Sequence, residues 1–105
     1  MAFVRSSAVV GNNSSSPTTL QAAVSGEAVI IGLVVANVST STDNITVLIN
    51  NSSNNFHLIK SAPVPVGSTL SVLDGKVVLG SGDSVKCYAG TSATALEATI
   101  SILTL

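Results

Sequence analysis

The apolar residues of this chain alternate with small polar residues or form short β-branched runs, and nowhere do they recur at helical spacing over a dozen residues. Successive side chains of a strand point to opposite faces, whereas a helix that packs on a core needs apolar positions three and four residues apart. The alternation is clearest in residues 96–103, where Leu, Ala and Ile alternate with Glu, Thr and Ser. The pattern therefore predicts an all-β fold.

Turn-prone clusters of Gly, Pro, Asn, Asp and Ser separate the predicted strands. We expect strands at 18–25, 28–37, 45–50, 56–61, 69–73, 76–79, 84–89 and 96–103, and either a first strand or an extended arm at 3–10. Eight or nine strands at a spacing of roughly ten residues are typical of a sandwich or barrel. We therefore predict one antiparallel, jelly-roll-like β-sandwich over residues 1–105, with residues 1–17 as a candidate N-terminal arm.

The segment 28–37 is the most apolar of the chain, and it is predicted to lie at the centre of a sheet with both faces covered. Its residues divide into two faces, Val29, Ile31 and Leu33 on one and Ile30, Val34 and Ala36 on the other. Pro63 and Pro65 cannot donate to a ladder, so they belong at a sheet edge or in a connection. Asp74-Gly75 predicts a hairpin between the strands on either side of it.

Composition excludes several classes of protein. Disorder requires low hydrophobicity and high charge, but 46% of the residues are hydrophobic and the net charge is -1. The four basic residues, Arg5, Lys60, Lys76 and Lys86, are scattered singly, which argues against a nucleic-acid partner. The longest apolar run, 28–36, is too short to span a bilayer as a helix, and no segment resembles a signal peptide. We expect a soluble protein made in the cytoplasm, without a membrane partner.

The size of the chain favours oligomerisation. A single cysteine allows no disulfide within the chain, and a domain of 105 residues with 3% aromatic residues has a small core. An interface between subunits would cover apolar surface that such a core cannot hold.

One short string suggests catalysis. Gly82-Asp83-Ser84 resembles the start of the motif of certain esterases, and a serine nucleophile would need His57, the single imidazole, together with Asp43, Asp74 or Asp83. The alternative interpretation is a turn between two strands, where Gly permits positive φ and Asp binds the local backbone. The turn is favoured, because the string lacks the strand-to-helix context of a nucleophile elbow.

The remaining chemistry-bearing residues are isolated. His57 and Cys87 are too few for a zinc site in one subunit, although His57 residues on an oligomer axis are an alternative, and Cys87 is predicted to be a small buried hydrophobe. The chain has few aromatic residues, which disfavours a site where sugars stack on aromatic rings. The N-x-S/T patterns for N-glycosylation that begin at Asn37 and Asn44 are attributed to chance. We therefore expect no catalytic, cofactor-binding or metal-binding residues, and no enzyme activity.

From residue 29 onward, the order of features resembles that of small β-sandwich virion structural proteins of tailed bacteriophages, especially cyanophages. The shared features are a strand ending in Asn, a tip loop, a P-x-G-S-T-L segment, an LDG turn, a VL-x-x-GD-x-V-K-x-x-A segment and a final Ile/Leu-rich strand. The matching residues are Asn37, Pro65, Gly67, Ser68, Thr69, Leu70, Leu73, Asp74, Gly75, Val78, Leu79, Gly82, Asp83, Val85, Lys86 and Ala89. The lead-in differs, because Ser25 replaces the usual Pro.

The resemblance implies a non-enzymatic virion protein without a cofactor, assembled in the host cytoplasm. Its implied partners are further copies of itself, with a trimer favoured, and the major capsid protein or other virion proteins. The first hypothesis is a capsid decoration or cement protein. The alternatives are a neck, baseplate or tail-fibre component, and a receptor- or glycan-binding module that uses the loops 51–55 and 90–94.

Overall fold

The computed structural model of the chain describes residues 1–73 and 75–105. Every regular element in this part of the chain is a strand. The nine strands are β1 (Ala2–Val9), β2 (Thr18–Gln21), β3 (Ala28–Asn37), β4 (Asp43–Asn51), β5 (Asn54–Val64), β6 (Thr69–Ser71), β7 (Val77–Leu79), β8 (Ser84–Ala89) and β9 (Leu96–Thr104). Accordingly, no membrane-spanning helix is found among the described residues.

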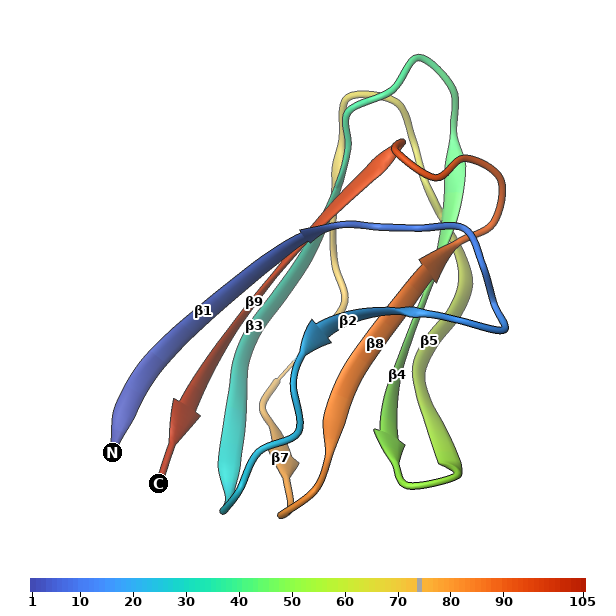
Figure 1. Cartoon of the computed structure of the whole chain (residues 1–105). Helices are drawn as coiled ribbons and strands as arrows, with labels where there is room; N and C mark the ends of the chain where they lie inside the picture. The colour runs from blue at the N-terminus through green and yellow to red at the C-terminus, as the bar shows by residue number, and fades with distance from the viewer. Residues whose placement is uncertain (74) are drawn as a thin grey trace.

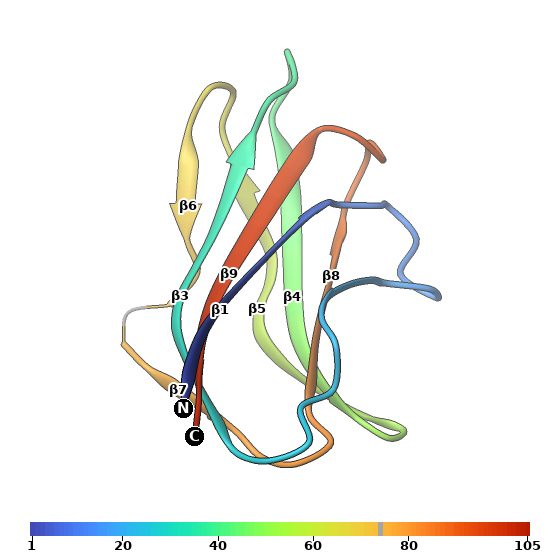
Figure 2. The same ribbon diagram turned by 60° about the vertical axis from the view of Figure 1, so that its left-hand side comes forward.

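The strands form two antiparallel sheets that pack face to face (Figure 1). Sheet A has the order β1-β9-β3-β6, with β7 also paired to β3, and sheet B has the order β2-β8-β4-β5. The two termini lie side by side because β1 and β9 pair along their whole length, from Ala2 opposite Thr104 to Val9 opposite Glu97 (Figure 2). The predicted all-β, jelly-roll-like sandwich is confirmed.

The core lies between the inner faces of the two sheets. Three strands alternate as predicted, since β4, β8 and β9 direct every second side chain inward. The fully buried members include Ile45, Val47, Val85, Cys87, Leu96, Ala98, Ile100 and Ile102. Their small and β-branched side chains fill the space between the sheets at the close packing of protein interiors.

Strand β3 is internal, as predicted, but its two faces differ from the prediction. A register shift between Ile30 and Gly32 places an additional residue in β3 against β9, so the alternation changes phase there. Ile30, Leu33 and Val35 are buried, whereas Ile31 and Val34 point outward and remain partly exposed. The prediction that both faces are covered is therefore wrong.

The N-terminal segment is a strand over residues 2–9 and not a projecting arm. β1 pairs with β9 of its own chain, and Val10 is fully buried in the core. β2 ends at Gln21, earlier than predicted. Its continuation still contacts sheet B, because the Val24 N–H donates to the Asp83 carbonyl at 3.1 Å and the Val24 carbonyl accepts from the Gly82 N–H at 2.8 Å.

The hairpin predicted at Asp74-Gly75 is wrong. β6 and β7 both pair antiparallel with β3, β6 near its C-terminal end and β7 near its N-terminal end. They therefore run in the same direction along one edge, as two parts of an interrupted strand. Asp74 itself lies outside the described residues.

Strand β5 forms one edge of sheet B, and it contains Pro63 while Pro65 follows it, as predicted. The strand is longer than predicted and shifts register twice against β4. At one shift Ser61 adopts a positive φ of 52°, and its N–H donates to the Thr46 hydroxyl at 3.0 Å. The tip of the β4–β5 hairpin also lies where it was predicted, with Ser52 at φ 56°.

Candidate functional site

The outer face of sheet A is rich in exposed apolar side chains. We use the name apolar outer face for Phe3, Val9, Val29, Ile31, Val34, Val78 and Leu103. Phe3 is 79% exposed, Val78 64% and Val9 54%, and Ile31 and Val34 are each 39% exposed. Scattered single apolar residues are normal on a protein surface, but a contiguous group is typical of an interaction site.

The strand register makes four members of this group contiguous. Phe3 lies opposite Leu103, Leu103 opposite Val29, and Val29 opposite Val78. Because directly opposite residues share a face of the sheet, these four side chains form a row across β1, β9, β3 and β7. A sequence without known strand order cannot show that residues 3, 29, 78 and 103 are neighbours.

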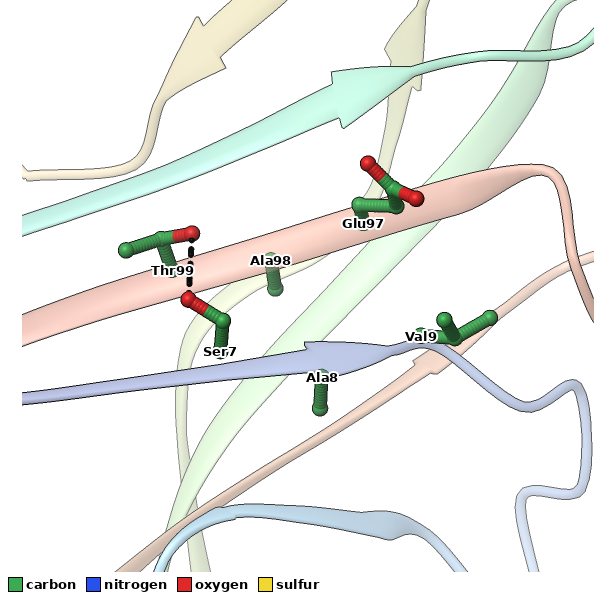
Figure 3. A pocket seen from close by; sticks show the side chains of 6 residues that line it. All are labelled: Ser7, Ala8, Val9, Glu97, Ala98 and Thr99. Carbon is green, nitrogen blue, oxygen red and sulfur yellow. Dashed lines mark hydrogen bonds between the residues drawn. The ribbon is translucent and has the colours of Figure 1, made fainter.

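Polar side chains lie on the same face beside this row, among them Ser101 of β9 and Thr69 and Ser71 of β6. Arg5 and Glu97 are the charged residues of the strands of sheet A, and both are exposed. Between them the Ser7 and Thr99 hydroxyls share a hydrogen bond of 3.0 Å. An open hollow of about 330 Å³ at this part of β1 and β9 is lined by Ser7, Ala8, Val9, Glu97, Ala98 and Thr99. Figure 3 shows these six side chains and the hydrogen bond between Ser7 and Thr99.

The outer face of sheet B is more polar. Lys86 and Tyr88 of β8 and Asn44 and Asn50 of β4 lie on it. Leu48 also points to this side, but it is only 3% exposed. Phe56 of β5 is 63% exposed, so sheet B also has an exposed apolar residue, but the row of four adjacent apolar side chains belongs to sheet A.

At one end of the sandwich, Asn37 holds the loop between β3 and β4. Its side-chain oxygen accepts hydrogen bonds from the Ser39 N–H and hydroxyl at 2.9 and 2.7 Å. Its amide donates to the carbonyls of Ser41 and Val64 at 2.9 and 2.8 Å. Asn37 is 3% exposed and its side chain is fully hydrogen-bonded, so its role is structural. This agrees with a chance origin for the N-glycosylation pattern that begins there.

Asp43 holds the neighbouring loop in the same way. One carboxylate oxygen accepts from the N–H groups of Asn44 and Thr91 at 2.8 and 2.9 Å, and the other accepts from the Ser92 N–H at 2.8 Å. Desolvation raises the pKa of Asp43, but the donors of Ser92, Asn44 and Thr91 together outweigh it and lower the pKa from its usual value. Asp43 thus connects the start of β4 to the β8–β9 loop as a carboxylate.

The string Gly82-Asp83-Ser84 forms the predicted turn. The Asp83 N–H donates to the Gly80 carbonyl at 3.1 Å, and the Asp83 carboxylate accepts from the Gly80 N–H at 2.9 Å. Gly82 has a φ of 89°, as the turn requires. The Ser84 hydroxyl donates to the Asn50 carbonyl at 3.3 Å, so its hydrogen bond joins β8 to β4 and does not reach an imidazole.

His57 and Cys87 lie apart. His57 is exposed on the edge strand β5 opposite Leu48, whereas Cys87 is fully buried on the inner face of β8. Burial raises the pKa of the Cys87 thiol to about 11, which agrees with the predicted small buried hydrophobe. Within residues 1–73 and 75–105, no cluster of three or more His, Cys, Asp or Glu side chains is placed to hold a metal.

Sequence reasoning missed the roles of Asn37, Asp43 and the apolar outer face. Asn37 is the last residue of the most apolar strand and Asp43 is the first residue of β4, and this position at strand ends was the one available signal. Their partners lie far along the chain, at Val64 and at Thr91 and Ser92. Contacts between residues so far apart in the sequence can be known only once the strand order is known.

No family model and no curated protein matches the sequence of the chain. Its fold is similar to the structure of Eiger TNF from S. frugiperda, with a TM-score of 0.50 and 10% identity over 100% of this chain and 94% of that one. It also aligns with hydroxypropylphosphonic acid epoxidase from S. wedmorenis, with a TM-score of 0.45, 12% identity and 97% coverage of this chain, which spans 42% of the epoxidase. At such identities the likeness to Eiger TNF shows a shared jelly-roll fold alone.

Proposed function

We propose that the chain is a non-enzymatic structural protein of a bacteriophage virion. Its proposed place is on the capsid, as a decoration or cement protein that assembles as a homo-oligomer and stabilises the lattice of the major capsid protein. The neck, the baseplate and the tail fibre are alternative places. Two things support the proposal, the resemblance of residues 29–105 to phage virion proteins and the apolar outer face.

The apolar outer face is the observation that carries the proposal. Exposing Phe3 and Val78 to water is unfavourable by roughly 25 cal/mol per Å² of apolar surface, and binding a second protein recovers that free energy. The face extends across β1, β9, β3 and β7, which suits another protein surface better than a small molecule. The low net charge leaves little repulsion between neighbouring copies on a particle.

Sedimentation with emptied capsids tests the proposal. The purified protein is mixed with phage capsids stripped of their decoration proteins, and the amount that sediments with them is measured. We expect saturable binding that Val34→Lys weakens, because the substitution replaces an exposed apolar side chain of the apolar outer face by a charged one. Thr19→Lys is the matched control, since Thr19 is exposed on a strand of sheet B.

Two outcomes would contradict the proposal in different ways. Absence of binding to capsids, combined with binding to necks or tails, would move the protein to another place in the virion. Binding of the purified protein to glycans or host cells, weakened by substitutions in loops 51–55 or 90–94 and not by Val34→Lys, would indicate a receptor-binding module.

A further inference from the structure

Three of the four sheet edges carry features that hinder the addition of another strand. β5 shifts register twice and contains Lys60 and Pro63. β2 has four residues and a register shift, and the edge opposite β1 is divided between the short strands β6 and β7. Proteins use short, bulged, charged or proline-containing edges of this kind to prevent pairing between molecules.

The edge formed by β1 has none of these features. Its eight residues pair one to one with β9 without a register shift, and Arg5 is its single charged residue. In Figure 1, β1 forms the outer margin of sheet A. A long, regular edge strand of this kind is a template for a further strand.

The register shows which backbone groups face outward. The Val10 N–H donates to the Leu96 carbonyl at 2.9 Å, which continues the register of β1 and β9. In an antiparallel pair, hydrogen-bonded residues alternate with residues whose backbone groups point the other way. The even residues of β1 therefore bond to β9, and Phe3, Arg5, Ser7 and Val9 direct their N–H and C=O groups to the free edge.

We propose that this edge pairs with a second copy of the chain, β1 antiparallel to β1, about a two-fold axis at Ser6. The inference rests on the proposed function and specifies its self-association. In this register Phe3 lies opposite Val9 of the second copy and Arg5 lies opposite Ser7, so each outward-facing backbone group meets its complement. Every opposed pair of odd residues exchanges two hydrogen bonds.

The side chains select this register. Phe3 and Val9 are the exposed large apolar residues at the outer side of β1, and they are equally far from Ser6, so the pairing covers both in each copy. A shift by two residues in one direction would place Arg5 opposite itself, and like charges in that position are destabilising. A shift by two residues in the other direction would place Phe3 opposite Gly11, which lies beyond the end of β1. A shift by one residue would exchange the inner and outer faces of the second copy.

The pairing also orients the dimer. A two-fold axis perpendicular to the sheet keeps both outer faces on the same side, so the apolar outer faces of two copies become one continuous surface. That surface is suited to a broad, flat partner such as a capsid lattice. A contact of this symmetry gives a dimer, whereas the phage resemblance favours a trimer, and the native mass distinguishes the two.

Light scattering and sedimentation equilibrium over a range of concentrations provide the first test. We expect the mass to rise from one chain to two, and we expect Phe3→Glu or Val9→Lys to weaken dimerisation about tenfold or more. The double variant Phe3→Glu/Val9→Lys should recover dimerisation. In it, the glutamate at position 3 of one copy lies opposite the lysine at position 9 of the other copy. Val78→Lys is the matched control, since Val78 is an apolar residue at the other edge of sheet A whose exposure lies between those of Phe3 and Val9.

Cross-linking tests the register. Ser6→Cys places two thiols directly opposite each other at a non-hydrogen-bonded pair, where Cα atoms are about 4.5 Å apart and a disulfide fits. Arg5→Cys, in the proposed register, leaves its thiols diagonal and out of reach. Mild oxidation should give a covalent dimer with Ser6→Cys and not with Arg5→Cys, while the native thiol of Cys87 stays buried.

Several results would overturn the inference. They are a monomer at every concentration up to millimolar, a trimer, a dimer that Val78→Lys dissociates and Phe3→Glu does not, or a disulfide with Arg5→Cys alone. These tests need no capsids. A parent chain that stays monomeric but binds capsids would refute the β1 contact only, and a dimer that does not bind capsids would refute the proposed function only.

Discussion

Replacing Asp43 by Asn changes one charge at almost constant shape, and the structure indicates a large loss of stability. The carboxylate accepts three backbone hydrogen bonds, from Asn44, Thr91 and Ser92, and it is 4% exposed. An amide can keep its oxygen toward Asn44 and Thr91, but its NH₂ group then faces the Ser92 N–H, donor against donor. Hydrogen bonds to a charged group contribute about 1.5–3 kcal/mol, and an unpaired buried donor costs about 1–3 kcal/mol.

We therefore expect Asp43→Asn to lower the free energy of unfolding by about 2–4 kcal/mol at neutral pH. Urea denaturation followed by circular dichroism measures this difference. Glu97→Gln is the matched control, because Glu97 is an exposed carboxylate on β9, and it should stay within about 0.5 kcal/mol of the parent chain.

The pH dependence separates charge from shape. Because the pKa of Asp43 is lowered in the folded state, its contribution is complete above the unfolded pKa of about 4 and is lost as the pH falls through the folded pKa. The difference between Asp43→Asn and the parent chain should therefore shrink in acid. A variant as stable as the parent at neutral pH, or a difference that does not change with pH, would refute this account of Asp43.

Three further predictions concern single residues. Asn37→Asp should destabilise the fold by about 2–4 kcal/mol in urea denaturation, because a carboxylate oxygen would face the Ser41 and Val64 carbonyls, and an unchanged midpoint would refute this role. Cys87, with its pKa raised to about 11 by burial, should react with a thiol reagent at pH 8 only when the chain unfolds, and rapid labelling of the folded protein would contradict its placement. Gly82→Ala should cost about 1–3 kcal/mol, because φ is 89° there, whereas Gly26→Ala, with open space around it, serves as the control in the same thermal melts.

The sequence allows the sandwich to be predicted, because the alternation in β4, β8 and β9 is a local pattern with one buried face. It does not predict the bulge in β3. There an additional residue changes which side chains of β3 face the core. Because the run is apolar throughout, its sequence does not show which residues face inward on either side of the bulge. Gly32 within the strand was the one local signal.

The missed hairpin and the missed surface have a common cause. Asp74-Gly75 has the residues of a tight turn, but β6 and β7 both find their partner in β3, which is a tertiary preference that local turn chemistry does not contain. The row of Phe3, Leu103, Val29 and Val78 likewise exists only once the strand order is known. The candidate site is therefore a product of topology, whereas the fold class follows from periodicity.

Cryo-electron microscopy of stripped capsids saturated with the protein tests the central claim most directly. The account predicts pairs of sandwiches joined at β1, with the apolar outer face of sheet A against the capsid shell. Density in which sheet B or the loops 51–55 and 90–94 contact the shell, or particles without bound protein on the capsid, would contradict it.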